Sequence, residues 1–399
     1  MLQAMLGAVS QGILWGIMVL GVFITYKLLD IADLTVDGSF ALGGCVCAVL
    51  VVNRGVDPWL ALLAGTLAGI VAGAVTGLLH TIFDIPAILA GILTQISLWS
   101  INLRVMGKSN VPLLKSPTIF AGIADTTGLP QSTVTMLVGL VFALATIGLL
   151  YWFFGTEIGS ALRATGNNED MSRALGIDTR VTKVIALMLS NGLVGLAGAL
   201  ICQSQKYADI GMGTGAIIIG LAAIVIGEVL GRLTPGKLRS FSSRLVAAVI
   251  GSVVYFLIRA IVLQLGMDAN DMKLLSAIIV AVAISYPTLM KLVDFQDRKL
   301  AARGMQLFRI LTITFSALIV LFAVLAVLIV AGKIHMTFLP VMWQLIVMIV
   351  LDLACVIIGA QLWKKANHID PVSEQNKVKF WLWNNMGVIA CVIAFVPMI

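Results

Sequence analysis

Long apolar runs divide this chain into segments that are separated by short polar stretches. Most runs contain about 20 residues, the length of an α-helix that crosses a hydrocarbon core of about 30 Å. The sequence does not show the alternating segments of about ten residues that form a membrane β-barrel. We therefore predict an all-α, polytopic membrane helix bundle. The predicted spans lie near 10–29, 38–53, 59–80, 86–103, 133–154, 184–203, 213–231, 244–265, 273–290, 309–332, 338–362 and 380–397.

Composition and charge agree with a membrane protein. Of the 399 residues, 60% are hydrophobic and 11% are charged, whereas soluble domains carry about 25% charged residues. The net charge of +7 does not indicate nucleic-acid binding, because Lys and Arg gather in alternate loops between the predicted spans. These are the loops after the fifth, seventh, ninth and eleventh spans, and all four lie on one side if the count is right. The positive-inside rule makes that side cytoplasmic.

The chain divides into two predicted blocks. Residues 1–290 hold nine spans and are rich in Gly, and residues 291–399 hold about three more spans with fewer Gly. The lead-in to the second block, "KLVDFQDRKLAARGMQLFRI", alternates basic and apolar residues and is typical of an interfacial helix. We place the boundary near Pro287 to Arg303 and predict a membrane extension of unknown role after it.

Two similar stretches in the first block indicate internal symmetry. "DIADLTVDGSFALGG" begins at Asp30 and "DIGMGTGAIIIGLAA" begins at Asp209. The predicted topology places them on opposite sides of the membrane. Spans two to five and six to nine are therefore candidates for an inverted repeat, an architecture that is common among transporters.

Motifs for enzyme chemistry are missing from the sequence. The three His residues and five Cys residues show no metal-ligand spacing, and neither HExxH nor GxSxG occurs. "GRLTPGKL" approaches a phosphate-binding loop, but Leu238 stands where Ser or Thr must reach magnesium. We predict no catalytic residue, no metal site, no bound cofactor and no ATP binding in this chain.

A compact polar stretch, residues 163–183, interrupts the apolar sequence and has the features of a short helix. Asn167 or Asn168 can cap its N-terminus. Glu169 and Arg173 stand four apart in the favourable order. Gly176 can adopt the left-handed conformation that ends a helix. The pattern predicts a capped helix of about two turns, followed by a new cap for the next span.

Met171, Ala174 and Leu175 share one face of this short helix, and we call them the apolar ridge. A helix of two turns is marginal in water, so something must pack against the ridge. Two alternatives remain at this point: the ridge lies on the protein's own membrane face, or a groove in a cytoplasmic partner receives it.

The stretch "GTEIGSALRATGNNEDMSRALGIDTRVTKVIALMLSNGLVGLAGAL" resembles the cytoplasmic coupling loop and following helix of ABC importer permeases, closest to the branched-chain amino acid permease type. "LTVDGSFALGG" and "ADIGMGTGAIIIGLAAIVIGEVLG" also resemble that family. The resemblance covers about 10–290. It implies a multi-pass protein of the bacterial cytoplasmic membrane that imports amino acids or similar small solutes, with tryptophan and tyrosine among the candidates.

The resemblance also implies partners and coupling residues. The expected partners are a second permease copy, ATP-binding subunits that hold ATP and magnesium, and an extracytoplasmic substrate-binding protein. The coupling loop is 155–183, and its expected contact residues are Arg163, Gly166, Asn168, Glu169, Met171, Arg173, Ala174, Leu175 and Gly176. Two features depart from the family: Met171 and Ser172 replace small alanines, and 291–399 exceeds the usual length.

Polar residues within the spans are candidates for a translocation path or for helix–helix hydrogen bonds. This set is Asp37, Ser39, Gln95, Asn102 and Asn191. Charges within spans are also functional candidates, because their burial in lipid is costly; these are Glu228, Arg259 and Asp352. Two other classes of protein remain open, an ion-coupled secondary transporter and a membrane sensor or scaffold. The small number of carboxylates within the spans of 1–290 disfavours the first.

Overall fold

The computed structural model describes residues 2–114, 116–233 and 240–264, and the structural statements below concern these residues. Predicted spans 273–290, 309–332, 338–362 and 380–397 lie outside them, as do the boundary near Pro287 to Arg303 and Asp352. Within the described part, eight segments are long and apolar enough to cross a membrane. They are Met5–Leu28, Thr35–Arg54, Pro58–Thr81, Ala87–Met106, Gln131–Phe153, Thr179–Gln205, Ile210–Gly231 and Phe241–Gln264.

These eight segments confirm the first eight predicted spans and the all-α membrane fold. The long helices are α1 (Leu2–Phe23), α2 (Thr35–Arg54), α3 (Pro58–Thr81), α4 (Ala87–Met106), α6 (Gln131–Phe153), α9 (Thr179–Gln205), α10 (Ala216–Leu233) and α11 (Phe241–Gln264). A π-helical turn, η1 (Ile24–Leu28), extends α1, and a 3-10 turn, η2 (Ile210–Gly213), precedes α10. The predicted span 38–53 was too short, because α2 begins at Thr35 and ends at Arg54.

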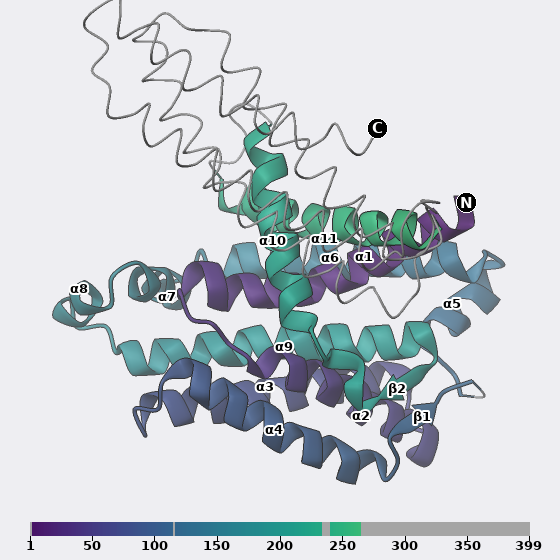
Figure 1. The fold of residues 1–399 in the computed structure, drawn as a ribbon, viewed down its shortest axis with the longest axis horizontal. Helices are drawn as coiled ribbons and strands as arrows, with labels where there is room; N and C mark the ends of the chain where they lie inside the picture. The colour runs from purple at the N-terminus through teal and green to yellow at the C-terminus, as the bar shows by residue number, and fades with distance from the viewer. Residues whose placement is uncertain (1, 115, 234–239, 265–399) are drawn as a thin grey trace, which may run out of the picture. The chain divides into compact units, whose positions relative to one another are not determined.

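The short elements gather at two opposite ends of the helix bundle (Figure 1). One end carries α5 (Ile119–Thr127) and two strands, β1 (Asn110–Pro112) and β2 (Tyr207–Asp209), which pair antiparallel with Val111 opposite Ala208. We call this the strand end. The other end carries α7 (Glu157–Asn167) and α8 (Glu169–Ala174). The sequence pattern did not predict α5 or the strands.

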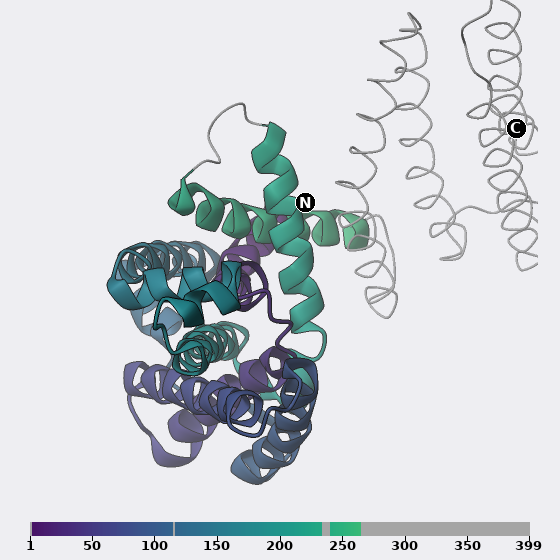
Figure 2. The same cartoon turned by 90° about the vertical axis from the view of Figure 1, so that its left-hand side faces the viewer.

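Helix α9 forms the centre of the bundle. Figures 1 and 2 show it between a layer that contains α1 and α6 and a layer that contains α3 and α4. Helix α3 carries glycines at four-residue steps, Gly65, Gly69, Gly73 and Gly77, and this glycine repeat faces α9. A Cβ on Gly69 would collide with the Asn191 carbonyl, and one on Gly73 with the Leu187 carbonyl. Only glycine allows this close approach of two helix backbones, so the repeat is a packing surface.

Helix α10 crosses the other long helices at a steep angle in both views (Figures 1 and 2). It packs closely on α11, because a Cβ on Gly227 would collide with the Ala247 carbonyl and one on Gly251 with the Ala223 carbonyl. Helix α1 in turn runs along α11, with Trp15 against Phe256 and Ser252 Oγ donating to the Gly12 carbonyl at 2.6 Å. Thus α1, α10 and α11 form one packed group beside α9.

Candidate functional site

The helix predicted within 163–183 is present as α8, with caps at both ends. Asn168, and not Asn167, is its N-cap, and its Oδ1 accepts from the backbone N–H of Met171 at 2.9 Å. The helix ends at Ala174, and Gly176 follows in the left-handed conformation with φ of 84°. Asp178 then caps α9. Because side-chain hydrogen bonds from Asn168 and Asp178 fix the starts of α8 and α9, α8 is a defined joint between α7 and α9.

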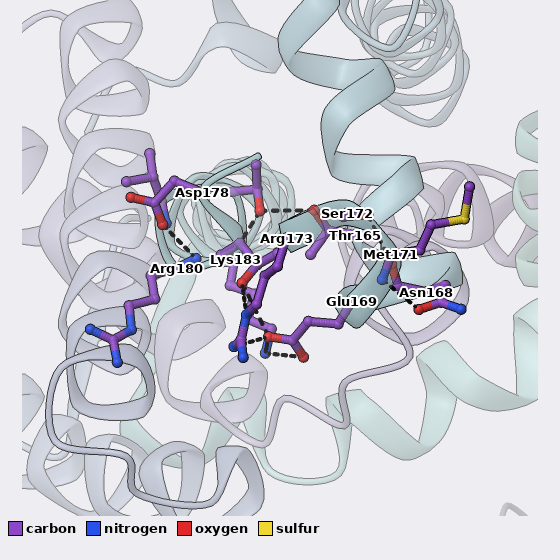
Figure 3. Close-up of polar contacts among 12 residues, drawn as sticks. Thr165, Asn168, Glu169, Met171, Ser172, Arg173, Asp178, Arg180 and Lys183 are labelled. Carbon is purple, nitrogen blue, oxygen red and sulfur yellow. Dashed lines mark hydrogen bonds and ion pairs between the residues drawn. The ribbon is translucent and has the colours of Figure 1, made fainter. Parts of the chain in front are cut away.

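Glu169 ties α8 to the first two turns of α9 (Figure 3). Its carboxylate accepts hydrogen bonds from Lys183 Nζ at 2.7 and 2.8 Å, from Arg173 Nη2 at 2.6 Å and from Thr179 Oγ1 at 3.2 Å. The bonds and charge of Lys183, followed by the charge of Arg173, hold the pKa of this carboxyl below its ordinary value of 4.5. Lys183 was not among the predicted coupling residues, although it lies in the matched motif.

Helix α7 is held against the ends of three long helices. Gly166 lies directly on the backbone of Leu28, where a Cβ would collide with its carbonyl oxygen. Arg163 donates a hydrogen bond to the Phe154 carbonyl, and its guanidinium lies 5.3 Å from the ring centroid of Phe241. These contacts connect α7 to α1, α6 and α11. Of the predicted coupling residues, Arg163 and Gly166 are therefore internal supports.

The apolar ridge of α8 points away from these supports. Met171 is 60% exposed and Leu175 is 69% exposed, and Ala174 is exposed between them. Ser172 on the opposite side is 2% exposed and donates to the Asn168 carbonyl. Figure 3 shows the Met171 side chain directed away from the Glu169 cluster. The described residues leave the ridge uncovered, an arrangement typical of a docking surface; its coupling role stays a prediction.

A second polar group lies inside the bundle, where the chain between α1 and α2 meets α9. Ser39 Oγ donates to Asn191 Oδ1 at 2.7 Å, and Asn191 Nδ2 donates to Asp33 Oδ2 at 2.7 Å. All three side chains are buried. Ser39 and Asn191 thus form the helix–helix hydrogen bonds that were the alternative to a path role. Asp33 was missed, since its sequence position does not show that it lies beside α9.

Asp37 connects the two similar stretches that begin at Asp30 and Asp209. Its carboxylate accepts from the backbone N–H groups of Gly215 and Ile217, both at 2.9 Å, at the start of α10. The two stretches therefore lie side by side, and each contains a non-helical segment followed by a long helix. This arrangement is compatible with an inverted repeat, which stays a prediction.

The remaining polar candidates are spread over other parts of the bundle. Gln95 is half-buried on α4, and Asn102 on the same helix is 1% exposed, with no hydrogen-bond partner for Oδ1 among the described residues. Glu228 forms an ion pair with Lys27 at 2.8 Å, which links α10 to η1. Arg259 lies over the ring of Phe256, 5.9 Å from its centroid. The five predicted path residues do not form one site, and their path role stays a prediction.

Comparison with known proteins agrees with this bundle. Residues 4–284 match the family described as branched-chain amino acid transport system / permease component. The tyrosine transport system permease protein of Clostridioides difficile is 37% identical over 279 residues, which are 70% of this chain and 90% of that protein. The ribose import permease protein RbsC of Escherichia coli is 27% identical over 256 residues, 63% of this chain and 75% of that protein. No solved structure matches the chain.

The described part of the chain is a polytopic helix bundle with a capped joint, α8, between two of its spans. This chain belongs to the branched-chain amino acid transport system permease family. It is a permease subunit of an ABC transporter and a multi-pass protein of the bacterial inner membrane. Permeases of this family work with an ATP-binding subunit and a substrate-binding protein.

Proposed function

We propose that this chain imports an amino acid or related small solute, driven by ATP hydrolysis in a partner subunit. ATP and magnesium are bound by that partner, and two copies of this chain form the membrane pore. The C. difficile relative, a tyrosine transport system permease, supports an aromatic amino acid as the substrate. The positive-inside pattern supports a strand end that faces outward, toward a substrate-binding protein.

The exposed apolar ridge on α8 is the observation that carries this proposal. Met171, Ala174 and Leu175 face outward from a helix that Glu169 ties to α9 and that α7 connects to α1. In the proposed mechanism, an ATP-binding subunit receives the ridge in a groove. When this ATP-binding subunit closes on a second ATP-binding subunit, it moves α8, and the rigid joint passes this movement to α6 and α9. Access to the path then alternates across the bilayer.

The test is Leu175→Asp in proteoliposomes that contain the assembled importer. A buried aspartate in an apolar groove is costly, so we expect uptake per ATP hydrolysed to fall by at least about tenfold. Leu175→Met is the matched control, because it keeps the ridge apolar and should preserve coupling. Normal coupling in the Leu175→Asp variant would show that the ridge is not the docking site.

Two other functions give different results in the same assay. An ion-coupled secondary transporter would move substrate without the ATP-binding subunit, with an ion gradient as its only energy source. A membrane sensor or scaffold would move no substrate in either condition. We expect uptake only when both the ATP-binding subunit and ATP are present.

A further inference from the structure

A cavity of about 500 Å³ opens between α1, α9, η2, α10 and α11 near the strand end. Its size falls within the range of about 300–1,000 Å³ that is usual for small-molecule sites. The wall residues come from α1, α2 and α9 through Trp15, Phe40 and Gln205, and from α11 through Phe256 and Arg259. None of the five predicted path residues lines it, but Arg259, a candidate because of its charge within a span, does.

Arg259 supplies the only charge among the side chains of the described residues that line this cavity. Its guanidinium lies over the ring of Phe256, and no carboxylate in the described part of the chain lies within ion-pair distance. A guanidinium presents a planar fork of N–H donors that matches a carboxylate with two parallel hydrogen bonds. The cavity therefore favours a ligand with a carboxylate.

The other walls are aromatic and amide groups. Trp15 lies 5.5 Å from Phe256, measured between ring centroids, and these two rings form an apolar wall of the cavity; the fully buried ring of Phe40 packs against Trp15 at 4.8 Å. Such walls bind a flat ring by stacking and edge contacts. Gln11 and Gln205 add neutral donors and acceptors, and their side chains lie 3.5 Å apart. No lining carboxylate among the described residues would repel the carboxylate of a ligand.

We propose that this cavity binds the transported solute within the permease, as a zwitterion with an aromatic side chain. The carboxylate pairs with Arg259, the ring lies on the Trp15 and Phe256 wall, and the ammonium group meets the amides of Gln11 and Gln205. The proposal rests on the import function proposed above. It adds a substrate site in the membrane subunit, at the end that would receive solute from a binding protein.

The full-length chain in lipid nanodiscs, without partner subunits, allows a direct binding measurement with L-tyrosine. Tyramine, which lacks the carboxylate, serves as the comparison ligand. We expect tyrosine to bind saturably and tyramine to bind at least about tenfold more weakly, because a charge-assisted hydrogen bond is lost. Arg259→Gln should weaken tyrosine at least about tenfold and change tyramine less than about twofold.

Two further variants separate recognition from folding. Arg259→Lys keeps a cation and should retain part of the preference for tyrosine over tyramine. Arg244→Gln removes an exposed arginine from the other end of α11 and should leave binding unchanged. Wild-type affinity and selectivity in Arg259→Gln would overturn the proposal.

Uptake by the assembled importer distinguishes failure of this site from failure of the proposed function. If the wild-type importer takes up tyrosine but the chain alone does not bind it, the site is wrong and the function stands. If the wild-type importer neither binds nor takes up tyrosine, the aromatic substrate and the site both fail.

Nanodiscs with and without phosphatidylglycerol test a lipid phosphate as occupant. Binding of phosphatidylglycerol that is lost in Arg259→Gln, with no tyrosine binding in nanodiscs that lack this lipid, would overturn the proposal in favour of a lipid site.

Discussion

At the residue scale, Glu169 is the side chain on which the position of α8 depends most. Glu169→Gln removes the charge that pairs with Arg173 and Lys183. Partly exposed ion pairs contribute about 0.2–1 kcal/mol each, so we expect α8 to lose about 1 kcal/mol of local stability. Amide hydrogen exchange in 168–178 should become about fivefold faster.

Asp170→Asn is the matched control for this change. Asp170 is adjacent to Glu169 and exposed, and it forms no ion pair with another described residue. The same loss of charge should therefore leave exchange nearly unchanged. Equal acceleration in both variants would contradict the role of Glu169 as the tie between α8 and α9.

The lowered pKa of Glu169 also predicts a pH dependence. Because the folded carboxyl has the lower pKa, its stabilising contribution is complete above the ordinary value of 4.5 and is lost as the pH falls through the folded value. Exchange in α8, corrected for intrinsic rates, should be constant from neutral pH down to about 4.5 and should rise as the pH falls from there through the folded pKa. Glu169→Gln should abolish this rise, and an identical acid response in both proteins would refute the assignment.

At the element scale, the close contact between α7 and the end of α1 depends on Gly166. A methyl group there would push on the Leu28 backbone, which cannot rotate away as a side chain can. We expect Gly166→Ala to cost about 2–3 kcal/mol and to lower the melting temperature measured by tryptophan fluorescence. Gly148→Ala is the control, because nothing lies within 4 Å of its Cβ position. An unchanged melting temperature in Gly166→Ala would show that α7 can shift without loss of stability.

Asp37 fixes the start of α10 beside α2 through two backbone N–H groups. Asn in its place keeps one accepting oxygen and loses the charge, so we expect Asp37→Asn to destabilise the protein by about 2 kcal/mol. Thermal unfolding in detergent measures this loss. Asp30→Asn, at an exposed position in the same segment, should change the melting temperature little. Equal effects of the two changes would exclude a special role for the Asp37 carboxylate.

The elements that could be predicted from the sequence are those specified by neighbouring residues. Apolar runs located eight spans, and the Asn168, Glu169 and Gly176 pattern located α8, because caps and i,i+4 pairs act within a few residues. The β1–β2 pairing, the Lys27–Glu228 ion pair and the bond between Asp33 and Asn191 join residues far apart in the chain. Only packing brings such residues together, so the charge within a span made Arg259 a candidate, whereas the cavity around it could not be predicted.

At the scale of the whole molecule, the family match covers residues 4–284 and leaves the C-terminal part of the chain outside it. The family match ends at residue 284, and the described helices already pack around α9 with a continuous buried core. A unit with its own core can fold alone. We therefore expect residues 1–290 to fold, to associate with the ATP-binding subunit and to support uptake at about the full-length rate.

The measurement for this prediction compares the truncated and full-length chains in the same proteoliposome assay. Retained uptake, with changed dependence on ligand or lipid, would assign 291–399 to regulation or to an added interface. Loss of uptake accompanied by normal α8 protection in amide exchange would show that the extension takes part in transport itself. Loss of both would mean that the packed group of α1, α10 and α11 needs residues beyond 290, and that the proposed boundary near Pro287 to Arg303 is wrong.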